Sequence, residues 1–189
     1  MAQLQLPIVP RRLYRYRSLT TRPEAVEQEI ESIRNRYIYC SEFVRMNDPM
    51  EGFFETGPDL RAHSRYREAI QQIRNNKLRF GLACFSETNE NVLMWAHYAS
   101  NYSGICIEYS ALDLIAGLPR EASVVRMAYV DELPEISQNE ARNAGDAAVY
   151  ILSQKKSNWA YEREWRVLAA LGEVSVGLEQ PITALYFGV

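Results

Sequence analysis

The sequence predicts a single α+β domain, spanning residues 1–189, in which mainly antiparallel sheets are combined with three or four helices. Short apolar stretches rich in Val, Ile, Tyr and Phe recur along the chain and are separated at irregular intervals by stretches with helical spacing. This order lacks the regular βαβ repeat that indicates a parallel sheet. The residues are 47% hydrophobic and 24% charged, as expected of a globular domain with its own core.

The strands are predicted where β-branched and aromatic residues cluster between turn signals. Seven segments have this character: residues 13–16, 37–40, 78–85, 104–109, 124–130, 167–171 and 182–187. The sequence ends directly after the last of these, where a natural domain would usually continue, so we expect that a C-terminal segment is missing.

The first helix has a recognisable start. Thr21 or Arg22 is the expected cap and Pro23 the first helical residue, a position that tolerates proline. Its apolar face is predicted from spacing and consists of Val26, Ile30 and Ile33. Three further helices are predicted over residues 60–76, 91–100 and 139–156.

Charge and cysteine content exclude several classes of protein. A net charge of -3 argues against a nonspecific nucleic-acid coat protein. The three cysteines are odd in number and widely spaced in apolar contexts, as in a cytoplasmic protein with reduced thiols. No signal peptide and no run of 18 apolar residues is present, so we expect no membrane partner.

The most informative stretch is 159–166, with the sequence Trp-Ala-Tyr-Glu-Arg-Glu-Trp-Arg, which precedes an apolar strand. Because side chains alternate along a strand, Glu162, Glu164 and Arg166 share one face if the extended backbone begins this early. Two carboxylates about 7 Å apart on one face form either an ion-pair network with arginine or a catalytic pair.

An arginine in the first predicted strand is the natural partner for these carboxylates. Arg15 lies between Tyr14 and Tyr16, and an arginine within a small sheet needs a counter-charge. We therefore expect Arg15 to pair with Glu162 or Glu164.

Two further groups of residues have both a structural and a functional interpretation. Trp95, His97 and Tyr98 on one short helix are either core aromatics or the wall of a pocket. Asn47 and Asp48 before a proline form either a self-bonded turn or part of a polar site.

Several standard sites are not supported by the sequence. Cys84 lies inside an apolar strand, where a thiol is normally inert, so a Cys84–His97 nucleophile is not favoured. The chain has two widely separated histidines and no metal-binding, phosphate-loop or serine-hydrolase motif, so no metal cofactor is expected.

Taken in order, the segments of this chain resemble a widespread bacterial family known as domain of unknown function 2971. The resemblance extends over nearly the whole chain and rests on residues 13–16, 39–41, 47–51, 84–87, 94–99, 104–107 and 156–166.

A second resemblance suggests a chemistry. An arginine on a first strand, a tyrosine or serine on a second and a Glu-x-Glu pair entering a late strand are similar to the triad of ADP-ribosyltransferases. The matching positions are Arg15, Tyr39 or Ser41, and Glu164, with Glu162 as the companion acid. That family implies a split sheet whose central cleft binds NAD.

The second resemblance implies NAD as substrate and either ADP-ribosyl transfer or NAD hydrolysis, as in a toxin or phage-defence effector. The acceptor is then protein, nucleic acid or water. Glu164 would stabilise the oxocarbenium-like transition state, Glu162 would activate the acceptor and Arg15 would hold the pyrophosphate. The substrate-binding residues are predicted to be Tyr14, Tyr39, Ser41, Asn47, Asp48, Trp95, His97, Tyr98, Trp159 and Arg166.

Two other functions stay open at this stage. In one, the chain is a binding module for a nucleotide, nucleic acid or protein, and its Arg and Glu residues form a structural network. In the other, Asp48, Glu51, Glu162 and Lys155 form a nuclease site that requires a divalent metal.

Overall fold

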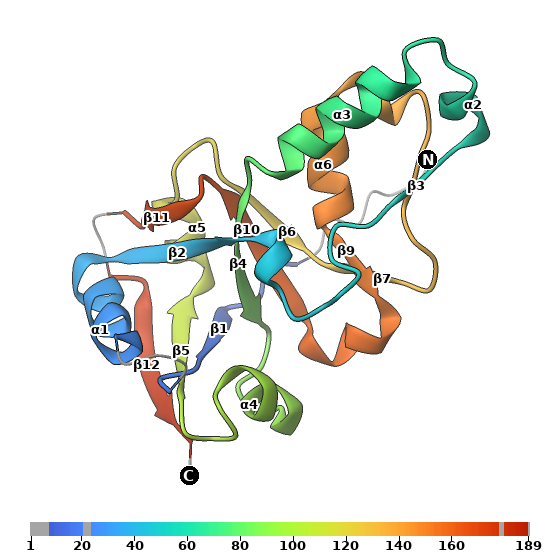
Figure 1. Ribbon diagram of the computed structural model, residues 1–189. Coiled ribbons are helices and arrows are strands. Elements are labelled where there is room, and N and C mark those ends of the chain that lie inside the picture. The colour runs from blue at the N-terminus through green and yellow to red at the C-terminus, as the bar shows by residue number, and fades with distance from the viewer. Residues whose placement is uncertain (1–7, 21–23, 178–179, 189) are drawn as a thin grey trace.

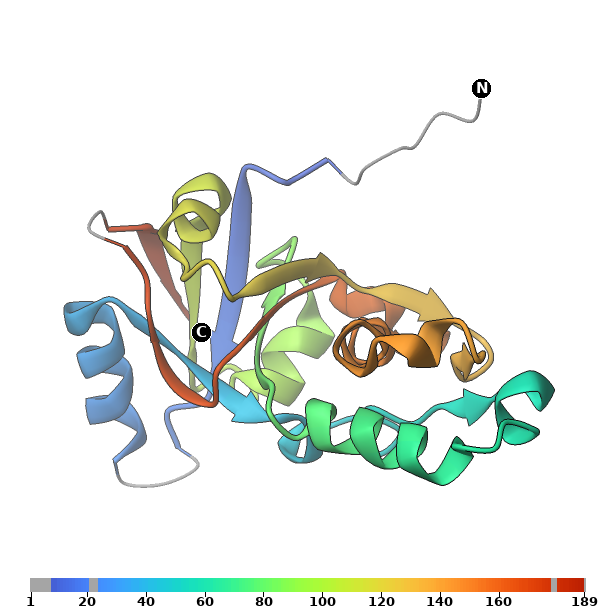
Figure 2. The same ribbon diagram turned by 90° about the horizontal axis from the view of Figure 1, so that it is seen from above.

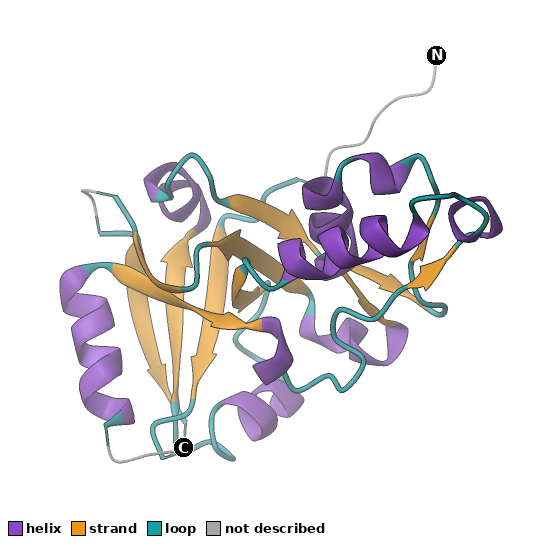
Figure 3. Cartoon of the chain, turned by 45° about the horizontal axis from the view of Figure 1, so that its top comes forward, coloured by secondary structure: helices purple, strands orange, loops and turns teal. Residues whose placement is uncertain are grey.

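The computed structural model describes residues 8–20, 24–177 and 180–188, and it confirms an α+β fold with a mostly antiparallel sheet. Figure 1 shows the sheet on one side and a helical lobe on the other. The same division is visible when the chain is coloured by secondary structure (Figure 3). Within the described residues, no helix combines the length and the hydrophobicity needed to span a membrane.

The main sheet contains eight strands in the described part of the chain, paired in the order β11-β2-β4-β1-β5-β12, with β10 joining β4 to β6. Their bounds are β1 (Arg12–Arg17), β2 (Tyr37–Glu42), β4 (Gly81–Ser86), β5 (Ile105–Ser110), β6 (Ser123–Arg126), β10 (Glu164–Ala169), β11 (Gly172–Ser175) and β12 (Ile182–Phe187). Two parallel pairs lie outside it: β3 (Glu55–Thr56) with β8 (Glu135–Ile136), and β7 (Ala128–Val130) with β9 (Gln154–Lys156).

The described residues form six α-helices, more than the three or four predicted. They are α1 (Ala25–Asn35), α2 (Pro58–Arg61), α3 (Tyr66–Lys77), α4 (Val92–Tyr98), α5 (Ala111–Gly117) and α6 (Ala144–Leu152). Short 3-10 helices are η1 (Phe43–Arg45), η2 (Glu140–Arg142) and η3 (Ser157–Glu162). The predicted helix 60–76 is divided between α2 and α3, and α5 was not predicted.

The main sheet divides at β4. One edge of β4 pairs with β10 along its whole length, while the other edge pairs with β2 at Gly81–Leu82 and with β1 at Ser86. Strands β1 and β2 therefore diverge from a common neighbour. Side chains from both strands, including Leu13, Ile38 and Cys40, belong to the same hydrophobic cluster.

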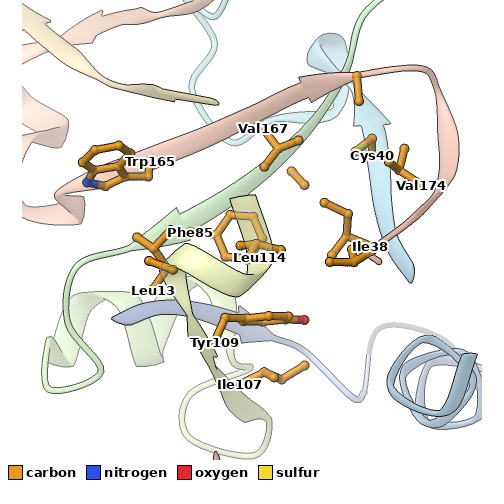
Figure 4. Packing of buried hydrophobic residues seen from close by; sticks show 14 of the residues in the cluster. Leu13, Ile38, Cys40, Phe85, Ile107, Tyr109, Leu114, Trp165, Val167 and Val174 are labelled. Atoms are coloured by element: carbon orange, nitrogen blue, oxygen red, sulfur yellow. The ribbon is translucent and has the colours of Figure 1, made fainter. Parts of the chain in front are cut away.

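The largest hydrophobic cluster lies where the diverging strands face α5 (Figure 4). Ile107 and Tyr109 of β5 pack with Phe85 of β4, and the Phe85 and Tyr109 rings meet edge to face with centroids 5.3 Å apart. Trp165 and Val167 of β10 extend the cluster. Alternate residues of β10 thus face the core, which leaves Glu164 and Arg166 on the other face of the sheet.

Helix α1 differs from its predicted packing. Val26 and Ile30 are 42% and 47% exposed, and of the predicted apolar face only Ile33 packs against the core. The helix instead buries Glu29, because this carboxylate pairs with Arg17 of β1. The predicted capping residues Thr21, Arg22 and Pro23 lie outside the described residues.

A helical lobe lies at the opposite end of the molecule from α1 (Figure 2). Helices α3 and α6 pack through a second cluster that includes Leu60, Ile73 and Ile151. Part of the predicted helix 139–156 is absent, because after α6 the chain becomes strand β9. The predicted strand 124–130 is likewise divided: Met127 separates β6, in the main sheet, from β7, which pairs with β9.

The branch at β4 predicts a specific sensitivity to side-chain size. A Cβ on Gly81 would lie 2.8 Å from the Ala170 carbonyl oxygen and 2.9 Å from the Cys40 carbonyl oxygen. Since both obstacles are backbone atoms, we expect Gly81→Ala to lower the free energy of unfolding by about 2 kcal/mol. Urea denaturation measures this change, and Ser175→Ala, at an exposed position of β11, is the control expected to have no effect. Equal stability of the two variants would contradict this packing.

Candidate functional site

Two carboxylates converge on one buried lysine next to the start of β10. Lys155 Nζ donates to Glu162 Oε2 at 2.5 Å and to Glu164 Oε2 at 3.2 Å. Glu162 ends η3 and Glu164 begins β10, so the extended backbone starts later than the alternation argument assumed. Between them, Arg163 adopts a left-handed conformation (φ 46°), which turns the chain so that both side chains face Lys155.

The β7–β9 pair positions the lysine. Lys155 is the register partner of Tyr129, whose hydroxyl oxygen accepts a 2.7 Å hydrogen bond from the Glu164 backbone N–H. The Lys155 ammonium also lies 4.8 Å from the centre of the Trp159 ring, a favourable cation–π contact. The β7–β9 pair, which lies outside the main sheet, therefore supplies both the cation and a hydrogen bond to the β10 backbone.

Arg166 extends this cluster into the interior. Its guanidinium is fully buried and donates to both Glu51 carboxylate oxygens, at 2.8 Å and 3.1 Å. It also donates to Glu164 at 2.9 Å and to the Leu152 carbonyl at 2.7 Å. The result is a continuous chain of alternating charges, Glu51–Arg166–Glu164–Lys155–Glu162.

The two carboxylates on Lys155 have opposite pKa displacements. Burial alone would raise the pKa of Glu164, but the charges of Arg166 and Lys155 outweigh it and lower this pKa to about 2. Burial raises the pKa of Glu162 above its ordinary value, and the nearby Glu164 charge adds to this effect against the pull of Lys155. Glu164 is therefore a permanent anion, while Glu162 holds a proton more readily.

A small pocket of about 70 Å³ opens onto these carboxylates. Tyr98 of α4 lies at its edge and donates from its hydroxyl to Glu162 Oε1 at 2.5 Å. The volume is well below the roughly 300–1,000 Å³ of pockets that enclose a whole ligand. The lining residues are Tyr14, Tyr16, Met46, Asn47, Cys84, Phe85, Ser86, Met94, Tyr98, Lys155, Glu162 and Glu164.

Five of the predicted site residues line this pocket, namely Tyr14, Asn47, Tyr98, Glu162 and Glu164. Two more predicted residues do not line the pocket but contact residues that do: Arg166 contacts Glu164, and Trp159 contacts Lys155.

The prediction that Arg15 pairs with Glu162 or Glu164 is wrong. Tyr14 and Tyr16 face the pocket, so the alternation of β1 directs Arg15 to the opposite face of the sheet. There Arg15 donates to the Tyr39 carbonyl at 2.7 Å and lies 5.7 Å from the Phe85 ring centre. It lines a separate pocket together with Tyr39.

The remaining predicted site residues also lie elsewhere. Trp95 is a core residue whose indole N–H donates to the Asn89 carbonyl, and its ring stacks on Tyr102 with centroids 5.4 Å apart. Asp48 accepts from the Met50 backbone N–H, the self-bonded turn considered above. Exposed His97 and strand residue Ser41 are not among the pocket lining.

Lys155 was considered only in the nuclease alternative, and no local pattern indicates its central role. Lys155 lies beside Lys156 in a polar segment that has no distinguishing pattern, and its pairing with β7 depends on tertiary structure. Cys84 was expected to be inert core, yet it lines the pocket; burial raises its pKa, so the thiol stays protonated.

The proposed nuclease cluster assembles only in part, since Glu162 contacts Lys155. Glu51 is engaged by Arg166 and Glu162 by Lys155, while Asp48 closes its own turn. Among the described residues, no group of three or more His, Cys, Asp or Glu side chains is placed to hold a metal ion.

The geometry defines an α+β protein in which a buried chain of charged residues lies beneath a small pocket. Residues 94–167 match the family described as protein of unknown function (DUF2971), which confirms the resemblance to that family over this stretch. The stretch contains residues 94–98 of α4, Lys155, both carboxylates and Arg166. Comparisons with curated proteins and with solved structures give no significant match, so the likeness to ADP-ribosyltransferases stays a prediction.

The charge chain predicts unequal effects of two similar substitutions. Glu164→Gln leaves Arg166 and Lys155 short of a counter-charge, so we expect a loss of about 3 kcal/mol of unfolding free energy. Glu162→Gln removes a carboxylate whose ionisation burial already disfavours, so we expect a change below about 1 kcal/mol. Chemical denaturation of both variants at pH 7 measures the difference. Equal losses of unfolding free energy in the two variants would show that Glu164 contributes no more to stability than Glu162.

The pKa of Glu164 also predicts a pH dependence. Because its pKa is lowered from 4.5 to about 2 on folding, its contribution is fully present above pH 4.5 and is lost as the pH falls toward 2. We expect wild type and Glu164→Gln to converge in stability by about 3 kcal/mol over this range. Denaturation curves of the pair between pH 5 and pH 2 measure it, and a constant gap would contradict the assigned shift.

Proposed function

We propose that this chain is an enzyme that cleaves the nicotinamide–ribose bond of NAD and passes ADP-ribose to water or to a protein or nucleic-acid acceptor. The observation that carries the proposal is the pair of carboxylates, Glu162 and Glu164, that share Lys155 at the base of the pocket with opposite pKa displacements. Paired acids whose environments separate their pKa values are typical of acid–base and glycosidic chemistry.

Glu164 is suited to electrostatic stabilisation of the transition state. Breaking the C1′–N bond sends the electron pair to the nicotinamide nitrogen and leaves positive charge on the ribose. A carboxylate with a pKa of about 2 stays ionised and can stabilise that charge without reorganisation.

Glu162 is suited to activate the acceptor. Its raised pKa makes the ionised form a better base than an exposed glutamate, and Tyr98 and Lys155 fix its two oxygens. The acceptor oxygen bonds to C1′ as its proton passes to Glu162. With water, the products are nicotinamide, ADP-ribose and a proton.

The walls of the pocket fit one part of the substrate only. Tyr14 and Tyr98 offer aromatic faces for the nicotinamide ring, and Asn47 offers an amide. A volume of about 70 Å³ means that the rest of NAD would lie outside the enclosed space. Arg15 plays no pyrophosphate-binding part in this proposal, because it lies in a different pocket.

A second candidate function is a binding module without chemistry. The observation that favours it is the complete pairing of Arg166 with Glu51 and Glu164, which gives these residues a structural role. In that case the pocket would hold a nucleotide or a partner group without turnover.

The biological setting follows from the proposed reaction. NAD cleavage in the cytoplasm would suit a toxin or a phage-defence effector, whose activity depletes the cofactor or modifies an acceptor.

The test is nicotinamide release from NAD by wild type, Glu162→Gln and Tyr98→Phe. Loss of a positioned general base commonly lowers the rate by about 10²–10⁴-fold, and we expect Glu162→Gln to fall in this range. Tyr98→Phe frees one Glu162 oxygen and should give a smaller loss. Glu162→Gln is preferred to Glu164→Gln because it leaves the Arg166 pairing intact.

Glu121→Gln is the matched control, since Glu121 is exposed and distant in sequence from every pocket residue. It should release nicotinamide at the wild-type rate. Full activity of Glu162→Gln would refute the assigned base. Saturable NAD binding without release, with and without protein and nucleic-acid acceptors, would favour the binding module.

A further inference from the structure

A second, larger hollow lies in the helical lobe, away from the Glu162 pocket. Its volume is about 550 Å³, within the range of roughly 300–1,000 Å³ that is typical of ligand sites. One wall is the stripe Tyr66, Ile70, Arg74 and Lys77 of α3, whose spacing places these residues on one helix face. The other wall is the segment 51–56, with Phe43 and Arg61 at its borders. We refer to this hollow as the α3 groove.

Two aromatic rings of the α3 groove, Phe43 and Phe54, are contacted by a buried lysine. Lys77 Nζ lies 5.1 Å from the Phe43 ring centre and 5.0 Å from the Phe54 ring centre, and it also donates to the Gly52 carbonyl. The neighbouring Phe53 is 52% exposed. The groove therefore offers a preformed aromatic surface that is open to solvent.

The charge of the α3 groove is positive. Arg61, Arg74 and Lys77 line it, against Glu51 and Glu55. Glu51 is already neutralised by Arg166. No ion pair among the described residues involves Arg61 or Arg74, so both guanidinium groups are available to an anion.

We propose that the α3 groove binds a nucleotide, with its phosphate on Arg61 and Arg74 and its base on the Phe53 and Phe54 rings. Guanidinium groups recognise phosphate through paired hydrogen bonds, and bases stack on aromatic side chains with little dependence on sequence. The exposed carboxylate of Glu55 opposes anion binding but leaves the sum of charges positive.

A free nucleotide and one nucleotide within a single-stranded nucleic acid both present a phosphate and a base. The site is separate from the Glu162 pocket and does not depend on NAD cleavage.

The experiment titrates the full chain with AMP and, separately, with a fluorescent short oligodeoxyadenylate. Arg74→Ala and Phe53→Ala should each weaken binding about tenfold, since each removes one charge-assisted contact or one stacking surface. Both residues are exposed, so neither change removes core packing. Added salt should weaken binding of wild type more than of Arg74→Ala.

Arg67→Ala is the matched control: Arg67 is an exposed arginine of the same helix but does not line the groove. It should bind either probe within about twofold of wild type, and so should Glu162→Gln. Binding of AMP with this pattern supports the proposal with a free nucleotide as ligand, and binding of the oligonucleotide alone supports it with a strand as source.

Three results would overturn the proposal. The first is no saturable binding of either probe, and the second is an Arg67→Ala loss equal to that of Arg74→Ala. The third is a loss confined to Glu162→Gln, which would place the nucleotide in the other pocket. These titrations measure nucleotide binding and do not depend on NAD cleavage. A negative result would therefore refute the nucleotide site without bearing on the proposed reaction.

Discussion

The buried guanidinium of Arg166 imposes the constraint on which the surrounding structure depends. A charge without solvent is tolerated only when its donors are satisfied, and Arg166 reaches Glu51, Glu164 and the Leu152 carbonyl to achieve this. Glu164 lies on the same strand as Arg166, whereas Glu51 lies in a loop and Leu152 at the end of a helix, so one side chain connects β10 to two other segments. Glu164 pairs with both Arg166 and Lys155, so it links the buried guanidinium to the residues that line the pocket. The order of charges therefore determines both the packing and the chemistry available to Glu162.

Much of the fold could be predicted from local pattern, because strands β1, β2, β5 and β12 are short segments rich in aromatic or β-branched residues and lie close to their predicted bounds. The errors arose where tertiary contacts override local preference. Residues 154–156 continue a helical sequence pattern but form β9, because they pair with β7. Val26 and Ile30 have core-like spacing but stay exposed, because α1 uses Glu29 to neutralise Arg17. Neither outcome depends on information within the segment itself.

The candidate site was predictable in its carboxylates but not in their partners. The run 162–166 concentrates charge beside an apolar strand, and that conflict alone marks Glu162, Glu164 and Arg166. Lys155 is only seven residues from Glu162 in sequence, so the partner is decided by tertiary placement and not by sequence distance. Arg15 has the right chemistry but the wrong strand face, since Tyr14 and Tyr16 take the pocket side. Lys155 has no local signal and is placed by a parallel pairing that sequence spacing does not reveal.

The separation along the chain between Arg166 and Glu51, 115 residues, has a consequence for the order of folding. Contacts so distant in sequence carry a large loop-closure cost and are formed after local helices and hairpins. Until then, the charges of the network are hydrated and contribute no attraction to the growing core. The other contacts of the network join residues 2 to 14 positions apart, so only the Glu51 contact carries this cost. Since that contact is expected to form late, its stabilisation acts mainly on the rate of unfolding.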